Sequence, residues 1–233
     1  MSPSPNPLGP PEPAGPAGPL PPSSPLAMML ALADSRLPVG GHVHSGGVEQ
    51  AVTDGVIRTA ADLADFLYRR LTTSGLVSAS IAAAVADGTL EVGSAQLETD
   101  ARTPSPAARK ASLAQGRGMA RLARRMWPDA DWSAHSPATH LPVISGSVGA
   151  ASGLSGFHTA LVVGYTTVSG SATAGQRLLA LDPADVAIMI TDLGPECEQV
   201  AAQAAVGLAD LSDPVLDVFA ERHERRPMPL FAS

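Results

Sequence analysis

Apolar positions recur at helical spacing along most of this chain. The clearest run lies between Thr59 and Gly88, where apolar side chains return every three or four residues: Leu63, Phe66, Leu67, Leu71, Val77, Ile81 and Val85. Thr59 is a suitable N-cap and Gly88 a suitable stop, so the pattern predicts one long helix between them. Few segments alternate with period two. The pattern therefore predicts an all-α fold.

Cap and stop residues place the remaining helices. They predict a helix from Ser24 to a break at Leu37-Pro38, one capped by Ser45 or Gly46, a short one capped by Thr89, helices over 106–127, 140–154, 155–168 and 176–181, and one that begins at Asp182-Pro183 and is kinked or divided at Gly194-Pro195. We expect these to form a single bundle of about eight or more helices over residues 26–211.

The helix predicted over 140–154 carries small residues at spacings of three and four: Gly146, Gly149, Ala150 and Gly153. Such a bare face lets another helix approach closely. Glycine costs about 1 kcal/mol per helical position relative to alanine, so close packing has to offset that loss. The packing is either internal to the chain or part of a subunit interface.

The first 25 residues have a different composition. They hold 11 of the 22 prolines and a single charge, Glu12. Closely spaced prolines favour extended polyproline conformations, so residues 1–25 are predicted to be a disordered tail. This tail is either a solvated linker or carries a recognition motif.

Charge and cysteine content exclude several classes of protein. The net charge of −7 argues against a general nucleic-acid binder. Cys197 is the one cysteine, so no intrachain disulfide can form. The longest early apolar run has eight residues and precedes the first basic residue, Arg36, which fits neither a signal peptide nor a membrane span. We expect a soluble cytoplasmic protein that uses neither a membrane nor nucleic acid.

His42 and His44 form a His-x-His pair that offers the main alternative function. Such a pair can bind nickel or zinc, and the alternative is a small metal-dependent hydrolase. A helical chain does not supply the further ligands that a metal hydrolase takes from neighbouring strands, so a hydrogen-bonded structural role is favoured for His44. Ser45 lacks the first glycine of a nucleophile elbow, and no Gly-Lys-Ser/Thr phosphate loop follows Gly46. We therefore predict no catalytic residue, metal ligand or cofactor.

The segment around this pair resembles the N-terminal signature of the urease accessory protein family UreF, Leu-Pro-x-Gly-Gly-Phe-x-His-Ser-Gly-Gly-Leu-Glu. The matching residues are Leu37, Pro38, Gly40, Gly41, His44, Ser45, Gly46, Gly47 and Glu49. Further blocks match in the same order: an Ala-Ser-x-x-Gln-Gly helix containing Gln115 and Gly116, a His-x-Pro-Val-x-x-Gly segment from His140, a helix led by Gln176, and the C-terminal residues from Ala220. The resemblance spans about residues 26–233.

The resemblance implies an all-helical, non-catalytic subunit in urease maturation. UreF proteins assemble with UreD (also called UreH) and the GTPase UreG on urease apoprotein to insert nickel, commonly as a homodimer within the complex. In this family the C-terminal tail orders on UreD. That places a partner-binding tail over residues 212–233, with Leu230 and Phe231 as anchors and Arg225 and Arg226 as polar contacts. Pro229 stands where the family usually has arginine.

A second candidate contact is electrostatic. Seven basic residues and no acidic one lie between Arg102 and Arg125. Arg117, Arg121 and Arg125 follow at steps of four and share one helix face. Such a stripe is either solvated surface or a docking face for an acidic partner.

Overall fold

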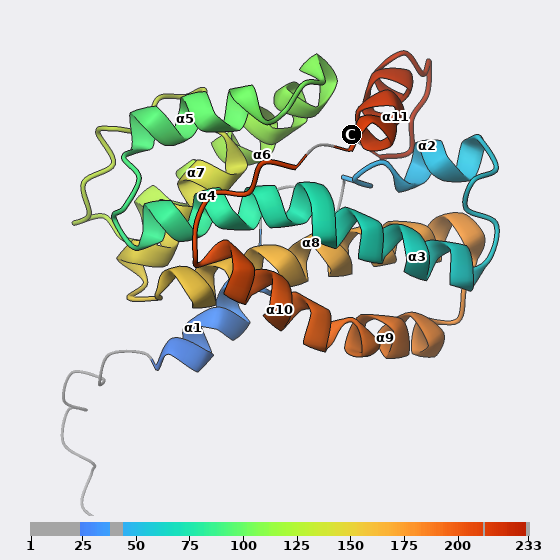
Figure 1. The fold of residues 1–233 in the computed structure, drawn as a ribbon, viewed down its shortest axis with the longest axis horizontal. Coiled ribbons are helices and arrows are strands. Elements are labelled where there is room, and N and C mark those ends of the chain that lie inside the picture. Colours follow the sequence, from blue (N-terminus) through green and yellow to red (C-terminus); the bar gives the residue numbers. More distant parts are fainter. Residues whose placement is uncertain (1–23, 38–43, 212, 232–233) are drawn as a thin grey trace, which may run out of the picture.

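The computed structural model describes residues 24–37, 44–211 and 213–231. The predictions for residues 1–23 and for Pro38, Gly40, Gly41 and His42 lie outside these residues. The described residues are α-helical and form no β-strand, as the pattern predicts (Figure 1). The helices are α1 (Pro25–Leu32), α2 (Val48–Thr53), α3 (Ala60–Arg70), α4 (Leu76–Ala86), α5 (Val92–Ala101), α6 (Pro106–Met126), α7 (Leu141–Ala151), α8 (Gly156–Leu179), α9 (Pro183–Asp192), α10 (Gly194–Ala204) and α11 (Pro214–Glu224).

Two long helical rods form the centre of the fold. One is α3 and α4, joined without a break by a π-helical segment, Leu71–Gly75; the other is α8. The rods pack on each other, with α10 against both α4 and α8 and α7 on the remaining side of α4. The largest core cluster lies where α3, α4, α8 and α10 meet and includes Leu63, Leu67, Leu71, Val168 and Val200. The predicted long helix from Thr59 is confirmed, and the π-helical segment within it is a feature that the pattern did not predict.

The break predicted after residue 168 is wrong. Helix α8 continues to Leu179 through a stretch of Gly, Ser and Thr. Gly175 faces Leu63 of α3, where an added Cβ would lie 2.5 Å from Leu63 Cδ2. Packing against the first rod therefore outweighs the low helix propensity of these residues.

Two predicted caps are also wrong. Thr89 does not begin α5; its hydroxyl donates to the Ala84 carbonyl at the end of α4, and Glu91 is the N-cap of α5. Neither Ser45 nor Gly46 caps α2, because Gly47 takes that position with a φ of 94°. Only a residue without Cβ adopts such a φ readily, which explains the glycine.

The stripe of small residues is used inside the chain. A Cβ at Gly146 would lie 2.6 Å from the Ala82 carbonyl oxygen on α4, and one at Gly149 would lie 2.2 Å from Thr159 Oγ1 on α8. These two glycines let α7 contact both central rods, which is the internal alternative. Gly153 has open space around it and a φ of 72°, and it follows the end of α7.

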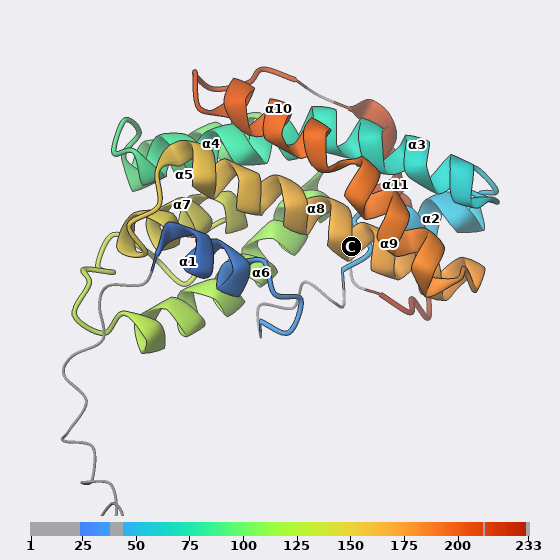
Figure 2. The ribbon, with the colours of Figure 1, turned by 90° about the horizontal axis from the view of Figure 1, so that it is seen from below.

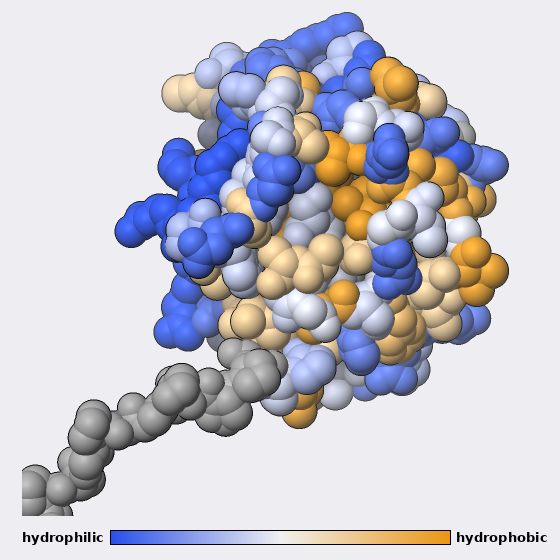
Figure 3. Space-filling model, turned by 90° about the vertical axis from the view of Figure 1, so that its left-hand side faces the viewer, coloured by the Kyte–Doolittle hydropathy of each residue, from blue (hydrophilic) through white to orange (hydrophobic). Residues whose placement is uncertain are grey.

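Helices α6, α2 and α11 lie together on the outside of the rods. Helix α11 packs on both α6 and α2, so the C-terminal part of the chain lies beside its N-terminal part (Figures 1 and 2). Phe219 of α11 contacts Phe66 of α3, with ring centroids 6.2 Å apart. Figure 3 shows the left-hand end of the molecule in Figure 1, where hydrophobic residues gather on the right half of the view.

Candidate partner-binding site

Glu49 lies where α2, α11 and the C-terminal residues meet. It occupies the first turn of α2 and is 1% exposed. His223 Nε2 of α11 lies 2.7 Å from Glu49 Oε2. The backbone N–H groups of Leu230 and Phe231 donate to the two carboxylate oxygens at 2.9 and 3.0 Å. One buried carboxylate thus binds a helix and the segment that follows it.

These hydrogen bonds also set the protonation of Glu49. Burial by itself would raise the pKa of the carboxyl group, because it disfavours the charged form. The hydrogen bonds from His223 and from the backbone of Leu230 and Phe231 outweigh burial and hold the pKa of Glu49 below its ordinary value. Glu49 is therefore ionised at neutral pH, and both of its oxygens accept hydrogen bonds.

Arginines of the C-terminal block, the residues from Ala220 onward, add further bonds to α2. Arg222 pairs with Asp54 at 2.8 Å, and Arg226 donates to the hydroxyl of Thr53. Arg226 also lies 3.6 Å from Glu49 Oε1. The sequence singled out Glu49 and Arg226 separately, on two motifs far apart, and the structure brings them together. His223, Thr53 and Asp54 were missed, since nothing in the sequence indicates a partner more than 160 residues away.

The residues before α2 form a tight connection against α3. Ser45 is fully buried, and Gly46 has a φ of 62°. Arg70 donates from Nη1 to the Gly46 carbonyl at 2.8 Å, and burial lowers the pKa of Arg70 to about 10. A Cβ at Gly46 would lie 2.6 Å from Arg70 Cζ. Gly46 is thus required both by its backbone angle and by the arginine beside it.

The other motif residues have structural positions. Gly116 of α6 lies so close to the loop before α7 that a Cβ would be 2.0 Å from the Thr139 carbonyl oxygen. Gln115 is partly buried on α6, and Gln176 is partly buried near the end of α8, where its carbonyl accepts from Leu181 N. Leu37 packs against the cluster that α1, α6 and α7 share.

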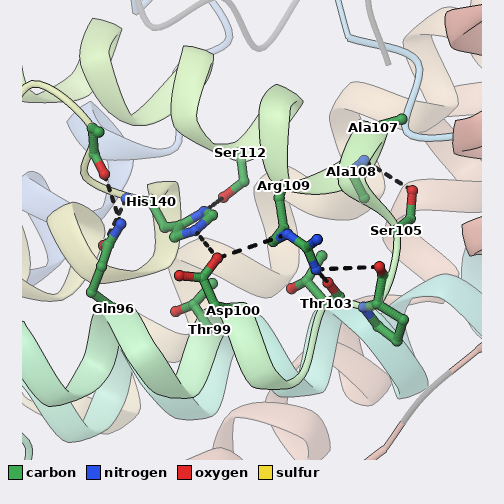
Figure 4. Close-up of polar contacts among 12 residues, drawn as sticks. Gln96, Thr99, Asp100, Thr103, Ser105, Ala107, Ala108, Arg109, Ser112 and His140 are labelled. Atoms are coloured by element: carbon green, nitrogen blue, oxygen red, sulfur yellow. Dashed lines mark hydrogen bonds and ion pairs between the residues drawn. The ribbon is translucent and has the colours of Figure 1, made fainter.

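The side chains of Ser112, His140 and Asp100 are hydrogen-bonded in the order of a Ser-His-Asp catalytic triad, but they lie at the start of α7 and cap that helix (Figure 4). His140 Nδ1 lies 3.0 Å from Ser112 Oγ, and Nε2 lies 3.1 Å from Asp100 Oδ1. Ser112 Oγ also accepts from the Leu141 N–H at the start of α7. The His140 side chain is 1% exposed, so these groups join α5, α6 and α7 rather than face a substrate.

The four predicted tail residues differ in exposure. Leu230 is 79% exposed, whereas Phe231 is 8% exposed and packs into the protein. Arg225 is exposed, and the Arg226 side chain is 25% exposed because it reaches toward α2. Proline at position 229 lies between two exposed apolar side chains, Met228 and Leu230.

The basic stripe lies on the outer face of α6. Arg117 and Arg121 are exposed, and neither forms an ion pair within residues 24–37, 44–211 and 213–231. Earlier on the same helix, Lys110 pairs with Glu224 of α11. The stripe is thus unpaired surface, and it begins about two turns along α6 from the contact between Lys110 and the C-terminal block.

The structure offers the hydrolase alternative no support. His42 is not among the described residues, and His44 lines a small cavity of about 190 Å³ beside Phe231. In the described part of the chain, no three His, Cys, Asp or Glu side chains are grouped as metal ligands. No described helix has the length and apolar character that a membrane crossing requires.

Comparison with known proteins identifies the family. Residues 57–194 match the family model described as UreF. The chain belongs to the UreF family. It is similar to the urease accessory protein UreF of Mycobacterium sp. (strain JLS), with 64% identity over 208 residues that cover 89% of this chain and 99% of the relative. It is 60% identical to UreF of Mycobacterium marinum and 58% identical to UreF of Mycobacterium tuberculosis H37Rv, with the same coverage.

UreF membership agrees with the positions of the motif residues. The signature residues Ser45, Gly46, Gly47 and Glu49 are placed by packing and by hydrogen bonds to the rest of the chain. They build the region to which α11 and the C-terminal segment attach. A UreF protein is an accessory protein of urease, so the surface around these elements is the candidate partner-binding site.

Proposed function

We propose that this chain is a non-catalytic subunit of the urease maturation complex. It assembles as a homodimer with UreD (UreH) and the GTPase UreG on urease apoprotein, in the cytoplasm, and supports nickel insertion. The chain itself supplies binding surfaces and no reactive group. Nickel is the cargo of this process and not a resident cofactor of the chain.

The observation that carries the proposal is the match to UreF proteins along 99% of their length. The internal use of the motif residues supports it, because a buried Glu49 or a capping Ser112 faces the protein rather than a ligand. The exposed Leu230 supports a contact with UreD, since a large apolar side chain in water favours burial against a partner.

Co-expression tests the assembly. The chain is expressed with UreD and UreG, and the purified species are analysed by size and composition. We expect a complex that holds two copies of this chain. In cells that make urease, loss of the chain should leave the enzyme without its full nickel content. Fully nickel-loaded urease in such cells would contradict the proposal.

The contact with UreD is tested at Leu230. The Leu230→Asp change places a charge on an exposed side chain and leaves the hydrogen bonds of its backbone in place, so the fold should survive while co-purification with UreD is lost. Val206→Asp is the matched control, because Val206 is 89% exposed and lies after α10. Equal recovery of UreD with both variants would exclude Leu230 as an anchor.

A further inference from the structure

The C-terminal segment and the arginine stripe on α6 lie on one face. Lys110, Ala111 and Ala114 of α6 line the cavity of about 190 Å³ together with residues of the C-terminal block. On the other side the cavity is lined by Pro229 and Phe231 and by His223 and Glu224 of α11, with His44 completing it. The cavity is thus the place where α6 and the tail meet.

Helix geometry continues this face along α6. Arg117 follows Ala114 by three residues and Arg121 follows Arg117 by four, so Lys110, Ala114, Arg117 and Arg121 lie on the same side of the helix. At 1.5 Å per residue, Lys110 and Arg121 are about 16 Å apart along the axis. Figure 2 shows α6 extending away from the C-terminus, and the stripe therefore leads from the cavity outward.

The basic residue of the face that lies at the cavity is paired with an acidic side chain, whereas those further along α6 are not. Lys110, at the cavity, is neutralised by Glu224. Arg117, Arg121 and Arg125, in the following turns, are exposed and have no acidic partner among the described residues. An unpaired row of cations in a protein of net charge −7 is complementary to an acidic surface.

The apolar end of the face is held in place by the fold. Glu49 binds the backbone of Leu230 and Phe231, which fixes Phe231 in the protein and leaves Leu230 projecting. Leu230 is therefore presented between Pro229 and Phe231, which both line the cavity.

We propose that these elements form one composite docking face for a single protein partner. That partner carries an acidic surface that lies along Arg117 and Arg121 and an apolar region that covers Leu230 and the cavity at Phe231. The inference rests on the proposed function, and UreD is the partner used to test it. The two candidate contacts thus act as one interface.

The first test asks whether UreD covers Ala114 in the complex. This residue lies between the cavity and the arginine stripe, so a single interface that includes both must cover it. Ala114→Cys is labelled with a maleimide in the free chain and in the purified complex with UreD. Ala202→Cys, on the exposed side of α10, is the matched control, and the native Cys197 is buried. We expect labelling at position 114 to slow by about tenfold or more in the complex and labelling at 202 to stay unchanged.

The outcomes separate the two proposals. A stable complex in which position 114 reacts as fast as in the free chain would overturn the composite face and leave the proposed function intact. Failure of the unsubstituted chain to bind UreD would contradict the proposed function and, with it, the face.

Charge reversal tests the acidic character of the partner. Arg117→Glu together with Arg121→Glu should weaken the complex by about tenfold or more, and by less at high salt. Arg177→Glu, near the end of α8, changes an exposed arginine that also has no ion pair among the described residues, and it should leave the affinity within about twofold. Equal affinities of these variants, or tighter binding of duplex DNA than of UreD at physiological salt, would overturn the proposal.

Discussion

At the scale of single residues, Glu49 shows how one carboxylate can fix a chain segment. Its two oxygens accept from a histidine and from two successive backbone N–H groups, and water does not reach them. A buried carboxylate is stable only when its acceptors are used in this way. The side chain therefore determines where residues 230 and 231 lie.

Replacing Glu49 tests that role. Glu49→Gln puts an amide NH₂ where a carboxylate oxygen accepts a hydrogen bond, so the variant should lose about 1–3 kcal/mol of unfolding free energy at pH 7. Because the folded-state pKa of Glu49 is lowered, the contribution of the carboxylate is complete above the unfolded pKa of about 4.5 and is lost as the pH falls through the folded value. Urea unfolding followed by circular dichroism between pH 7 and pH 3 measures both effects.

The control for this experiment is Asp65→Asn, which changes an exposed carboxylate with no hydrogen bond or ion pair in the described part of the chain. It should alter stability little at any of these pH values. A difference between wild type and Glu49→Gln that stays constant down to pH 3 would contradict the assignment.

Gly116 makes a second prediction at this scale. A Cβ there would lie 2.0 Å from a backbone oxygen that cannot move alone, so Gly116→Ala should lower the unfolding free energy by about 1–3 kcal/mol. Gly93→Ala on α5 has open space and should be neutral or stabilise by up to about 1 kcal/mol. Thermal unfolding of the two variants compares them; equal melting temperatures would show that α6 and the loop before α7 are not in contact.

The sequence alone singled out Glu49 and Gly116 but not their roles. Both residues were singled out because they belong to segments that resemble motifs of the UreF family. Why each is required depends on residues far along the chain, Phe231 for Glu49 and Thr139 for Gly116. No local pattern specifies such pairs.

At the scale of elements, α11 is held at its start by one acidic side chain. Asp213 is the N-cap, and its Oδ1 accepts from Val215 N. Its carboxylate also pairs with Arg69 of α3, with both oxygens 2.6 Å from guanidinium nitrogens. Burial favours the neutral acid, but the bonds from Arg69 and the helix backbone outweigh it, and the pKa of Asp213 is lowered. The start of α11 is thus joined to the first central rod.

Two substitutions separate the cap from the ion pair. Asp213→Asn keeps a capping oxygen and loses the charge, which should cost about 1 kcal/mol because half of the Arg69 side chain is exposed. Asp213→Ala loses both and should cost about 1–2 kcal/mol more. Asp182→Ala on α9 is the control, because Asp182 caps its helix without an ion pair among the described residues. Denaturant unfolding measures the free energy of unfolding of the three variants. If Asp213→Ala is no less stable than Asp213→Asn, Asp213 does not stabilise α11 as an N-cap.

Element prediction succeeded where caps and apolar spacing agree. Thr59 and Asp182 cap α3 and α9 as the sequence predicts, and α6 begins at Pro106 as predicted. It failed in α8, where glycine and serine predict a break, because those residues are buried against neighbouring helices. The π-helical segment Leu71–Gly75 has no distinguishing signal, since its apolar spacing differs by a single residue from that of an α-helix.

At the scale of the whole molecule, the buried Cys197 reports on the integrity of the fold. It lies in the largest core cluster, and burial, together with Glu196 and Glu198, raises the pKa of its thiol to about 11. The reactive species is the thiolate, so the native thiol should be inert at pH 7.5. Reaction with a thiol reagent should therefore follow the loss of circular dichroism in increasing urea.

Ala202→Cys provides the comparison, because it places an exposed thiol on the same helix. That thiol should react fully in the native protein. Rapid reaction of Cys197 in native buffer would mean that α10 detaches from the rods well below global unfolding.

The fold class follows from the sequence, and the arrangement of helices does not. Apolar spacing determines that Leu63 and Val168 are buried, yet it does not say that α3 packs on α8 or that α11 returns to α2. Those contacts depend on matching shapes, such as Gly175 against Leu63 and Gly149 against Thr159.

The bond between Glu49 and Phe231 spans 182 residues of the chain. During translation, Glu49 leaves the ribosome long before its acceptor oxygens can be satisfied, and α2 docks in its final form only after Phe231 has emerged. Nascent chains fold from the N-terminal side as they are made. In this protein, completion of the earliest motif thus waits until the segment that carries Leu230 and Phe231 has been made.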